Sequence, residues 1–464
     1  MAPEFEHSWR SWRLPTAAAA ALTCLVLPGC RTYTPVPLAL DEALEAFHAR
    51  ASTWAGVEEW LEAPAGSKPL QFEPEDGLAL EEGLLVALAF HARNRLARLD
   101  WQRASAGSDW AGRFYDPVLD AELLRVTENA PERWAWALGL GLRIPVGGRR
   151  SAEKAVARAR LTEARSELLV TAWSVERDVR SAWLDWSLAL AQKSVTEAFI
   201  DQLEPLQERA EKLAQGGELN PATAALFRLE RSRQLGLLAG LAGRTRAAEL
   251  RVKASIGLAP DAPVELRPEL PRSALAIARS PGYPLSHPQV QALSASYQVA
   301  EENLRLAIAK QWSDLTLGPR VEDDAGQMRI GLLGAVPLPL WNGNGPAIVA
   351  AWSDRNEARL RATVAAEKLV GQWATWQAEL EAAEAQRAAL EDMLAPLMSE
   401  QLAQAREMLR LGQGSTLVIL ESMVRSNQLD LERLKVRAAI GKAANEMATL
   451  AGRRQAGNPA EEKL

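Results

Sequence analysis

The sequence predicts a mainly α-helical protein with transmembrane β-strands, arranged as two tandem repeats of helix, strand, strand, long helix and helix. Two observations lead to this fold class. The pattern from Arg143 to Gly257 returns from Pro337 to Gly452, and each copy follows a stretch that alternates at period two. The copies are offset by 194 positions without a gap. Six residue pairs carry this offset: Pro145 and Pro339, Glu163 and Glu357, Arg165 and Arg359, Leu226 and Leu420, Gln234 and Gln428, and Leu235 and Leu429.

A long helix in each copy is predicted from an apolar seam. Apolar residues follow one another at alternating steps of four and three, which keeps one side of a helix against a partner helix, as in a coiled coil. In the first copy they are Leu168, Ala172, Val175, Val179, Ala182, Trp186 and Ala189. No proline or turn cluster interrupts Arg149–Glu204. At about 1.5 Å per residue the helix should be on the order of 100 Å long, too long to wrap around a compact core.

Each long helix is expected to turn back at a glycine-containing segment, because glycine supplies the left-handed conformation that ends a helix. The first turn is predicted at Gln215-Gly216-Gly217 and the second at Gly412-Gln413-Gly414-Ser415. Each half of the chain should therefore form a long antiparallel helical hairpin. Shorter helices are expected before the alternating stretches, at Leu78–Ala106 and Pro288–Gln311.

Four segments alternate at period two, as strands do when one face is apolar. They are Phe114–Thr127, Trp134–Ile144, Leu315–Glu322 and Met328–Val336, with polar turns at 128–132 and 322–326. Aromatic residues gather near the strand ends, as in the interfacial belts of membrane barrels. They are Trp110, Phe114, Tyr115, Trp134, Trp136, Trp312 and Trp341. The alternative is a soluble antiparallel sheet packed on the helices.

Four strands are too few to close a barrel, and an open edge in lipid would leave backbone groups without hydrogen bonds. If the strands span a membrane, several copies of the chain must complete the barrel together. The smallest outer-membrane barrels have about eight strands and water-filled ones have more. A dimer therefore satisfies the minimum, and a trimer fits a water-filled pore better.

The composition argues against several classes of function. A formal net charge of −6 and a pI near 5.6 provide no basic surface for nucleic acid. With 4 His and 2 Cys the chain lacks the ligands of a zinc or soft-metal site, and no cofactor is expected. Ser151-Ala-Glu-Lys154 matches the Ser-x-x-Lys pattern of β-lactamases but lacks its supporting motifs, and Ser151 is expected to cap a helix. No catalytic residue is predicted, and the protein is not expected to be an enzyme.

The amino terminus has the features of an export signal. An apolar stretch follows Arg10 and Arg13 and ends in Leu27-Pro28-Gly29-Cys30, which resembles the bacterial lipoprotein cleavage box. Residues 1–29 are therefore interpreted as a signal peptide, with Cys30 as the lipidated residue and 30–76 as an extended tail. The repeats are assigned to 77–265 and 266–464. An ordinary export signal with an incidental cysteine is the alternative.

Several short motifs together resemble the TolC family of outer-membrane efflux proteins. They are Phe114-Tyr-Asp-Pro-Val-Leu119, Ile144-Pro-Val-Gly-Gly-Arg-Arg150, His287-Pro-Gln-Val290, Val336-Pro-Leu-Pro-Leu-Trp-Asn-Gly-Asn344 and Gly414-Ser-Thr-Leu-Val-Ile-Leu-Glu421. The resemblance implies a homotrimer with a 12-stranded barrel in the outer membrane of a Gram-negative bacterium and a 12-helix tunnel in the periplasm. It also implies two protein partners, a periplasmic adaptor (membrane fusion protein) and an inner-membrane pump of the RND type. Two motifs are closest to the branch that exports heavy metals, so the cargo is expected to be metal ions or drugs.

The same resemblance indicates one pore position. In the family, acidic residues on the helix after the second turn narrow the pore, and Glu421 matches the second of them, whereas Val418 replaces the first. A ring of like charges attracts cations. The alternative is that Glu421 is an ordinary polar position of a helix. A second interpretation of the whole chain also remains open: a lipid-anchored periplasmic coiled-coil scaffold or adaptor without a pore.

Overall fold

The computed structural model describes residues 33–54, 56–57, 72–125, 127, 134–271, 279, 282–324, 326–338, 340–411 and 416–452. The chain divides into two units, residues 1–47 and 48–464. The chain is extended from Tyr33 and then enters α2 (Leu40–Thr53), which begins in the first unit and ends in the second and is mostly exposed. The predicted lipidation site, Cys30, lies outside the described residues.

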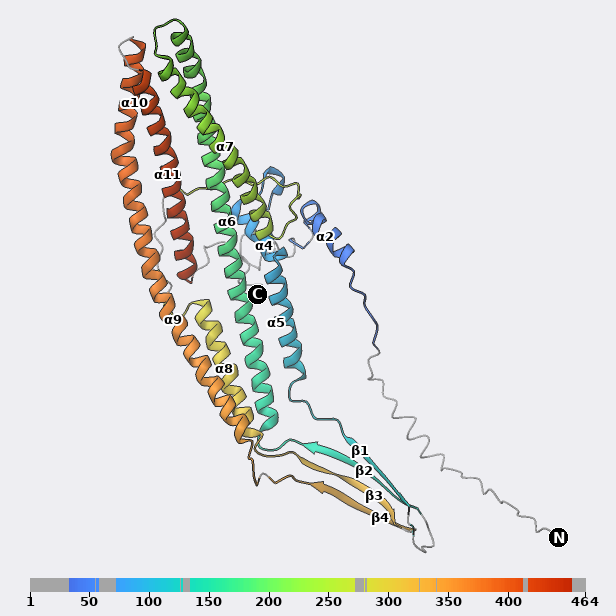
Figure 1. The fold of residues 1–464 in the computed structure, drawn as a ribbon. Coiled ribbons are helices and arrows are strands. Elements are labelled where there is room, and N and C mark those ends of the chain that lie inside the picture. Colours follow the sequence, from blue (N-terminus) through green and yellow to red (C-terminus); the bar gives the residue numbers. More distant parts are fainter. Residues whose placement is uncertain are drawn as a thin grey trace, which may run out of the picture. The chain divides into compact units, whose positions relative to one another are not determined.

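The second unit contains the two predicted repeats of helix, strand, strand, long helix and helix (Figure 1). The first repeat consists of α5 (Ala92–Trp110), β1 (Val118–Arg125), β2 (Trp134–Ile144), α6 (Arg149–Gln215) and α7 (Pro221–Ser255). The second consists of α8 (Pro288–Ala309), β3 (Leu315–Asp324), β4 (Gln327–Ala335), α9 (Gly345–Ala388), the π-helix η2 (Ala389–Leu394), α10 (Ala395–Arg410) and α11 (Thr416–Leu450). The predicted fold class is confirmed at the level of the single chain.

One predicted helix is wrong: the segment Leu78–Ala106 forms two helices instead of one. A short 3₁₀ helix, η1 (Pro74–Asp76), precedes α4 (Leu80–Phe90), and α5 begins only at Ala92. His91 between them is extended and caps α5 with its side chain, which accepts a hydrogen bond from the Arg93 N–H. Helix α4 is buried around almost its whole circumference, so it is a core helix and not an amphipathic one.

Helix α6 is the central element of the second unit, where it packs against α5, α7, α8 and α11. The predicted seam faces these partners. Leu168, Ala172, Val175 and Val179 are each at most 2% exposed, as a packed coiled-coil seam requires. A second apolar cluster joins the two hairpins: Phe199, Leu203 and Phe227 of the first pack with Ile419, Leu420 and Met423 of the second.

The gapless offset of 194 positions is correct only as far as η2. On α9 the buried residues Leu369 and Trp373 lie 194 positions after the buried Val175 and Val179. Beyond η2 the buried positions agree at an offset of 195. The buried pairs at that offset are Ala210 and Ala405, Ala224 and Ile419, Gln234 and Leu429, Leu241 and Val436, Ala248 and Ala443, and Val252 and Met447.

The π-helix η2 explains this change of register. A single inserted residue in an α-helix is accommodated by hydrogen bonds from i to i+5, which form a π-bulge and leave the following turns on the same side of the helix. The second repeat therefore carries one extra residue within Ala389–Leu394. The pairs Leu226/Leu420, Gln234/Gln428 and Leu235/Leu429, which supported the gapless alignment, are not structurally equivalent.

The first hairpin turns back as predicted. Helix α6 continues through Pro205 to Gln215, Gly216 caps it, and Gly217 has a φ of 78°. The second predicted turn contains Gly412, Gly414 and Ser415, which lie outside the described residues; α10 ends at Arg410 and α11 begins at Thr416. Among the helices of the described residues, none is both long enough and apolar enough to cross a lipid bilayer.

Candidate functional site: the two faces of the four-stranded sheet

The four strands form one antiparallel sheet in the order β1-β2-β3-β4. Its two hairpins come from different repeats and are joined through β2 and β3. The register confirms the alternation expected from the sequence, because residues opposite one another across the ladders lie on the same face. One lateral row, for example, contains Leu119 and Leu140, and the neighbouring row contains Asp120 and Gly139. Within the described residues, no further strand pairs with the outer edge of β1 or of β4.

One face of the sheet, here called the apolar face, carries mainly large apolar side chains that the chain itself does not cover. Leu332 is 86% exposed and Ile330 79% exposed. The other exposed apolar residues of this face are Leu119, Leu123, Trp134, Leu138, Leu140, Leu142, Ile144, Leu317 and Met328. Soluble single chains rarely expose a continuous apolar surface of this kind, and such a surface indicates contact with lipid or with another protein.

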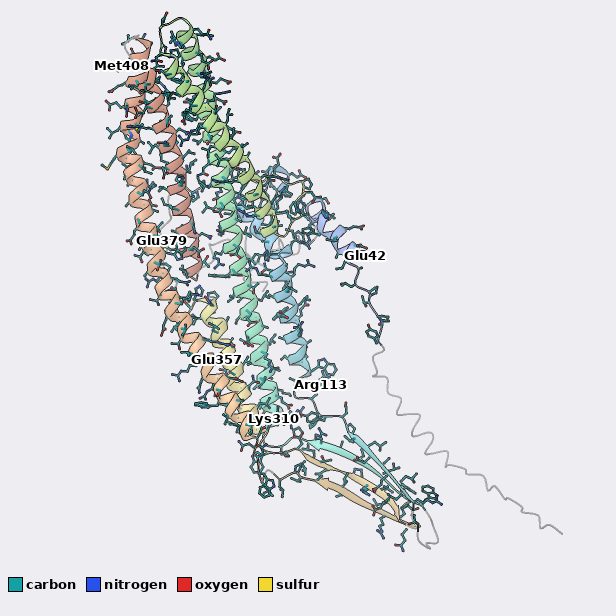
Figure 2. All side chains as sticks on the ribbon, viewed as in Figure 1. Glu42, Arg113, Lys310, Glu357, Glu379 and Met408 are labelled. Carbon is teal, nitrogen blue, oxygen red and sulfur yellow. The ribbon has the colours of Figure 1, made fainter. Side chains whose placement is uncertain are left out.

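The predicted aromatic residues lie toward the two ends of the strands. Trp134 and Trp136 belong to the start of β2, where the Arg125 guanidinium stacks on the Trp134 ring at 5.8 Å from its centroid. Four others belong to the segments that connect the helices to the sheet, where Figure 2 labels Arg113 and Lys310. Trp110 ends α5, Tyr115 precedes β1, Trp312 precedes β3 and Trp341 follows β4. Trp341 is 95% exposed. At about 3.3 Å per residue, β2 separates these two levels by roughly 30 Å.

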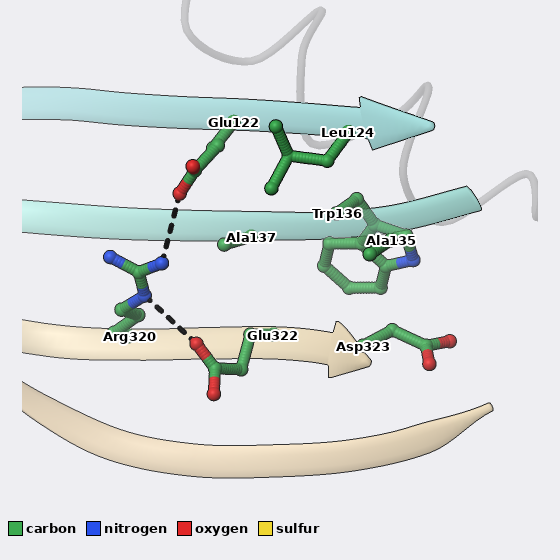
Figure 3. A pocket seen from close by; sticks show the side chains of 8 residues that line it. All are labelled: Glu122, Leu124, Ala135, Trp136, Ala137, Arg320, Glu322 and Asp323. Atoms are coloured by element: carbon green, nitrogen blue, oxygen red, sulfur yellow. Dashed lines mark hydrogen bonds and ion pairs between the residues drawn. The ribbon is translucent and has the colours of Figure 1, made fainter. Parts of the chain in front are cut away.

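The opposite face, here called the polar face, carries a chain of ion pairs across the strands (Figure 3). Arg320 on β3 donates to Glu122 Oε2 on β1 at 3.0 Å and to Glu322 Oε2 at 3.1 Å. Arg329 on β4 lies 3.8 Å from Glu322 Oε1. Glu122, Arg320 and Glu322 border a pocket of about 250 Å³ together with Leu124, Ala135 and Ala137. No single segment of the sequence predicts this network, because it joins residues of three strands and depends on the register between them.

The strands β2 and β3 approach closely at Gly318. A Cβ atom at this position would lie 1.6 Å from the Leu140 carbonyl oxygen, so only glycine fits. The ladder has Gly139 opposite Arg320 and Leu142 opposite Leu317 on either side of this point. The predicted turn at 322–326 is shorter in the structure, because β3 continues to Asp324 and Asp324 already pairs with Gln327.

The ends of the strands are tied to the helices by ion pairs between the repeats. Arg149 at the start of α6 donates to both carboxylate oxygens of Asp314, at 3.2 and 3.1 Å, and to Glu153 at 3.1 Å. The Tyr115 hydroxyl donates to the same Glu153 carboxylate. Ser151 is not the helix cap that the sequence predicts: Gly148 is the cap residue, and the Ser151 hydroxyl donates back to its carbonyl at 2.6 Å.

Glu421 lies on the exposed side of α11, away from the buried Ile419, Leu420 and Met423. Its carboxylate accepts a hydrogen bond from Arg425 one turn later at 2.5 Å, and both side chains are 56% exposed. The arginine partner was not part of the sequence prediction, although its spacing of four residues is the one that places ion pairs on one helix face.

His287 caps α8 as His91 caps α5, so the two repeats begin in the same way. Its Nδ1 accepts from the Gln289 N–H at 3.2 Å, its Nε2 lies 3.3 Å from the Thr449 carbonyl, and its ring packs edge-on against Trp173. Both contacts fit a neutral ring that donates from Nε2 to Thr449. Burial lowers the pKa of the His287 imidazole, and the hydrogen bond to Thr449 opposes part of that shift.

This environment predicts a loss of stability in mild acid. As the pH falls below about 6.5, the imidazole of the unfolded chain becomes protonated while the folded one stays neutral, so the free energy of unfolding should fall. His287→Asn keeps a capping acceptor without a titrating ring. Its thermal midpoint should decrease less than that of the wild type between about pH 7.5 and pH 5.5. Equal decreases in both proteins would contradict this role of His287.

No protein-family model and no curated protein sequence matches the chain. Solved structures do. The outer membrane protein VceC from Vibrio cholerae is 16% identical, with a TM-score of 0.68 over 80% of this chain and 96% of that chain. CusC, whose crystal structures concern folding and transmembrane channel formation, is 15% identical. Its TM-score is 0.69 over 84% of this chain and 99% of that chain. The CmeC outer membrane channel from Campylobacter jejuni is 13% identical with a TM-score of 0.68 over 87% and 93%. The single-chain fold expected from the resemblance to the TolC family is thus confirmed.

Proposed function

We propose that this chain is the outer-membrane channel of a tripartite efflux system, a passive exit duct with no chemistry of its own. The observation that carries the proposal is the sheet with its two contrasting faces. One face exposes large apolar side chains and the other a row of charged ones. This combination suits a wall between lipid and a water-filled lumen, where apolar and polar positions alternate along each strand. The fold shared with outer-membrane channels supports the same conclusion.

The proposed channel is a homotrimer. In lipid the outer edges of β1 and β4 need partners, because unpaired backbone groups are costly there. A ring in which β4 of one copy pairs with β1 of the next would satisfy both edges. Three copies would supply the 12 strands and the 12-helix tunnel that the family resemblance implies. The helical hairpins would extend into the periplasm.

The remaining assignments follow from this orientation. The aromatic residues at the two strand ends would lie at the two membrane interfaces. The hairpin tips, at Gly216 and Gly217 and at the predicted turn with Gly412, Gly414 and Ser415, would contact a periplasmic adaptor bound to an inner-membrane pump of the RND type. Lipidation of Cys30 would add an anchor in the outer membrane. Glu421 would line the pore near the tips, where Arg425 would offset its charge.

A periplasmic scaffold or adaptor without a pore is the competing function. In that role the apolar face would be exposed to water or would have to be covered by another protein. Two measurements separate the alternatives. A channel should migrate as a heat-modifiable trimer from outer-membrane fractions and give stable single-channel conductance in planar lipid bilayers. A monomer that gives no conductance would support the scaffold.

The lipid contact of the apolar face can be tested with two neighbouring residues. Leu332 lies on the apolar face, whereas Gly331 lies on the polar face, where a Cβ atom would meet no other atom within 4 Å. Arginine at the middle of a lipid-facing strand costs about 2–4 kcal/mol. Leu332→Arg should therefore reduce the amount of trimer in the outer membrane, whereas Gly331→Arg should leave it near the wild-type level. Equal amounts of both variants in the membrane would argue against lipid at Leu332.

A further inference from the structure

On the polar face, Arg320 of β3 pairs with Glu122 of β1, although β2 lies between these two strands. Its guanidinium starts from β3, passes over β2 and reaches Glu122 on β1, while its Nε holds Glu322 on its own strand (Figure 3). The side chain is 37% exposed, so the bridge lies on the surface of the sheet and is not buried within it. Its charge therefore acts on the solution next to the polar face.

The sequence of β2 makes room for this bridge. The residues of β2 on the polar face next to Arg320 are small: Ala135, Ala137, Gly139 and Gly141; the large Arg143 lies at the helical end of the strand, opposite Thr316. Ala137 lies opposite both Glu122 and Glu322, and Gly139 lies opposite Arg320. A large side chain at either position would stand between the guanidinium and Glu122. The large residues of β2 thus form part of the apolar face, and its small residues leave space on the polar face for the Arg320 side chain.

The Arg320 side chain changes the charge balance of two rows of residues that lie side by side across the strands. One row contains Glu122, Glu322 and Arg329, and the next contains Asp120 and Arg320. Counting formal charges, these rows carry three carboxylates and two guanidinium groups, so Arg320 provides half of the positive charge. In a closed ring each subunit would repeat these rows around the lumen, where rings of charged side chains determine which ions pass.

We propose that Arg320 is a specificity-determining residue of the pore, which limits its preference for cations by offsetting part of the negative charge of Glu122 and Glu322. This inference rests on the proposed channel function. It concerns the sheet and is independent of Glu421 at the far ends of the helices. The expected consequence for the cargo is that small anions and neutral solutes pass this level more readily than they would with the two carboxylates uncovered.

Reversal potentials in a KCl gradient across planar bilayers test the proposal. Arg320→Met, which keeps an unbranched side chain and removes the charge, should raise the ratio of K⁺ to Cl⁻ permeability by about threefold, and Glu122→Gln should lower it. The double variant should lie near the wild type. Arg125→Met is the matched control, because Arg125 lies on the same sheet but on the apolar face beside Trp134 and should change the ratio far less.

The outcomes separate this inference from the proposed function. Absence of conductance in the wild type would contradict the proposed channel function itself. Conductance with an unchanged permeability ratio in Arg320→Met, or an equal change in Arg125→Met, would overturn the role of Arg320 alone. A merely structural role would change the thermal stability of the trimer without changing the ratio in a charge-dependent direction. Surface ion pairs contribute little to stability, so the trimer is expected to survive each substitution.

Discussion

Gly318→Ala should separate the two sheet hairpins and abolish channel formation. The added methyl group would lie 1.6 Å from the Leu140 carbonyl oxygen and 2.7 Å from its carbonyl carbon. Backbone atoms cannot rotate away as a flexible side chain can, so β2 and β3 would have to move apart. Overpacking of side chains costs about 1–3 kcal/mol, and a clash with the backbone should cost at least that much. The lost stability would be that of the β2–β3 ladder, which joins the two repeats.

Gly331→Ala is the control for this substitution. Gly331 lies on β4 of the same sheet, and a Cβ atom there would meet nothing within 4 Å. It should match the wild type in thermal unfolding in detergent, followed by the loss of β-sheet circular dichroism, and in conductance. A Gly318→Ala protein with wild-type unfolding and conductance would show that β2 and β3 can separate without cost.

The sequence predicted the long helices and the strands because each is determined by a local pattern. The seam from Leu168 to Ala189 repeats over many turns, and the alternation from Trp134 to Ile144 matches β2 at both ends. The break at His91 was missed for a physical reason. Helix α4 is apolar around most of its surface and α5 follows after one residue, so a single helical pattern covers both. Only tertiary burial of α4 against α6 distinguishes them.

The features of the candidate site that remained hidden are all non-local. Arg320 and Glu122 are far apart in the sequence, and their ion pair depends on the register of two ladders. Gly318 is needed because of the backbone of a different repeat. The register change at η2 was hidden for a different reason. Identical residues such as Gln234 and Gln428 coincide by chance at an offset of 194. The buried positions beyond η2 correspond at an offset of 195, and burial cannot be read from the sequence.

Deleting Met393 should be tolerated, whereas deleting Val364 should not. Both residues are exposed apolar positions of the same long helical segment, 69% and 49% exposed. Met393 belongs to η2, so its removal would convert the π-helix to a regular α-helix and leave α10 and α11 in their present register. The thermal midpoint should stay close to that of the wild type, and the trimer should form.

Val364 lies in the regular part of α9, where a deletion rotates every following residue by about 100°. Leu369 and Trp373 would then leave the apolar cluster that they form with Met447 and Leu450. Exposing two large core side chains costs several kcal/mol, about 2–5 for each. The yield of heat-modifiable trimer in outer-membrane fractions should therefore fall to background for this deletion and stay near wild type for the other. If removal of Met393 were as damaging, the extra residue in η2 would be required by the fold itself, because a regular helix could not then connect α9 to α10 in the observed register.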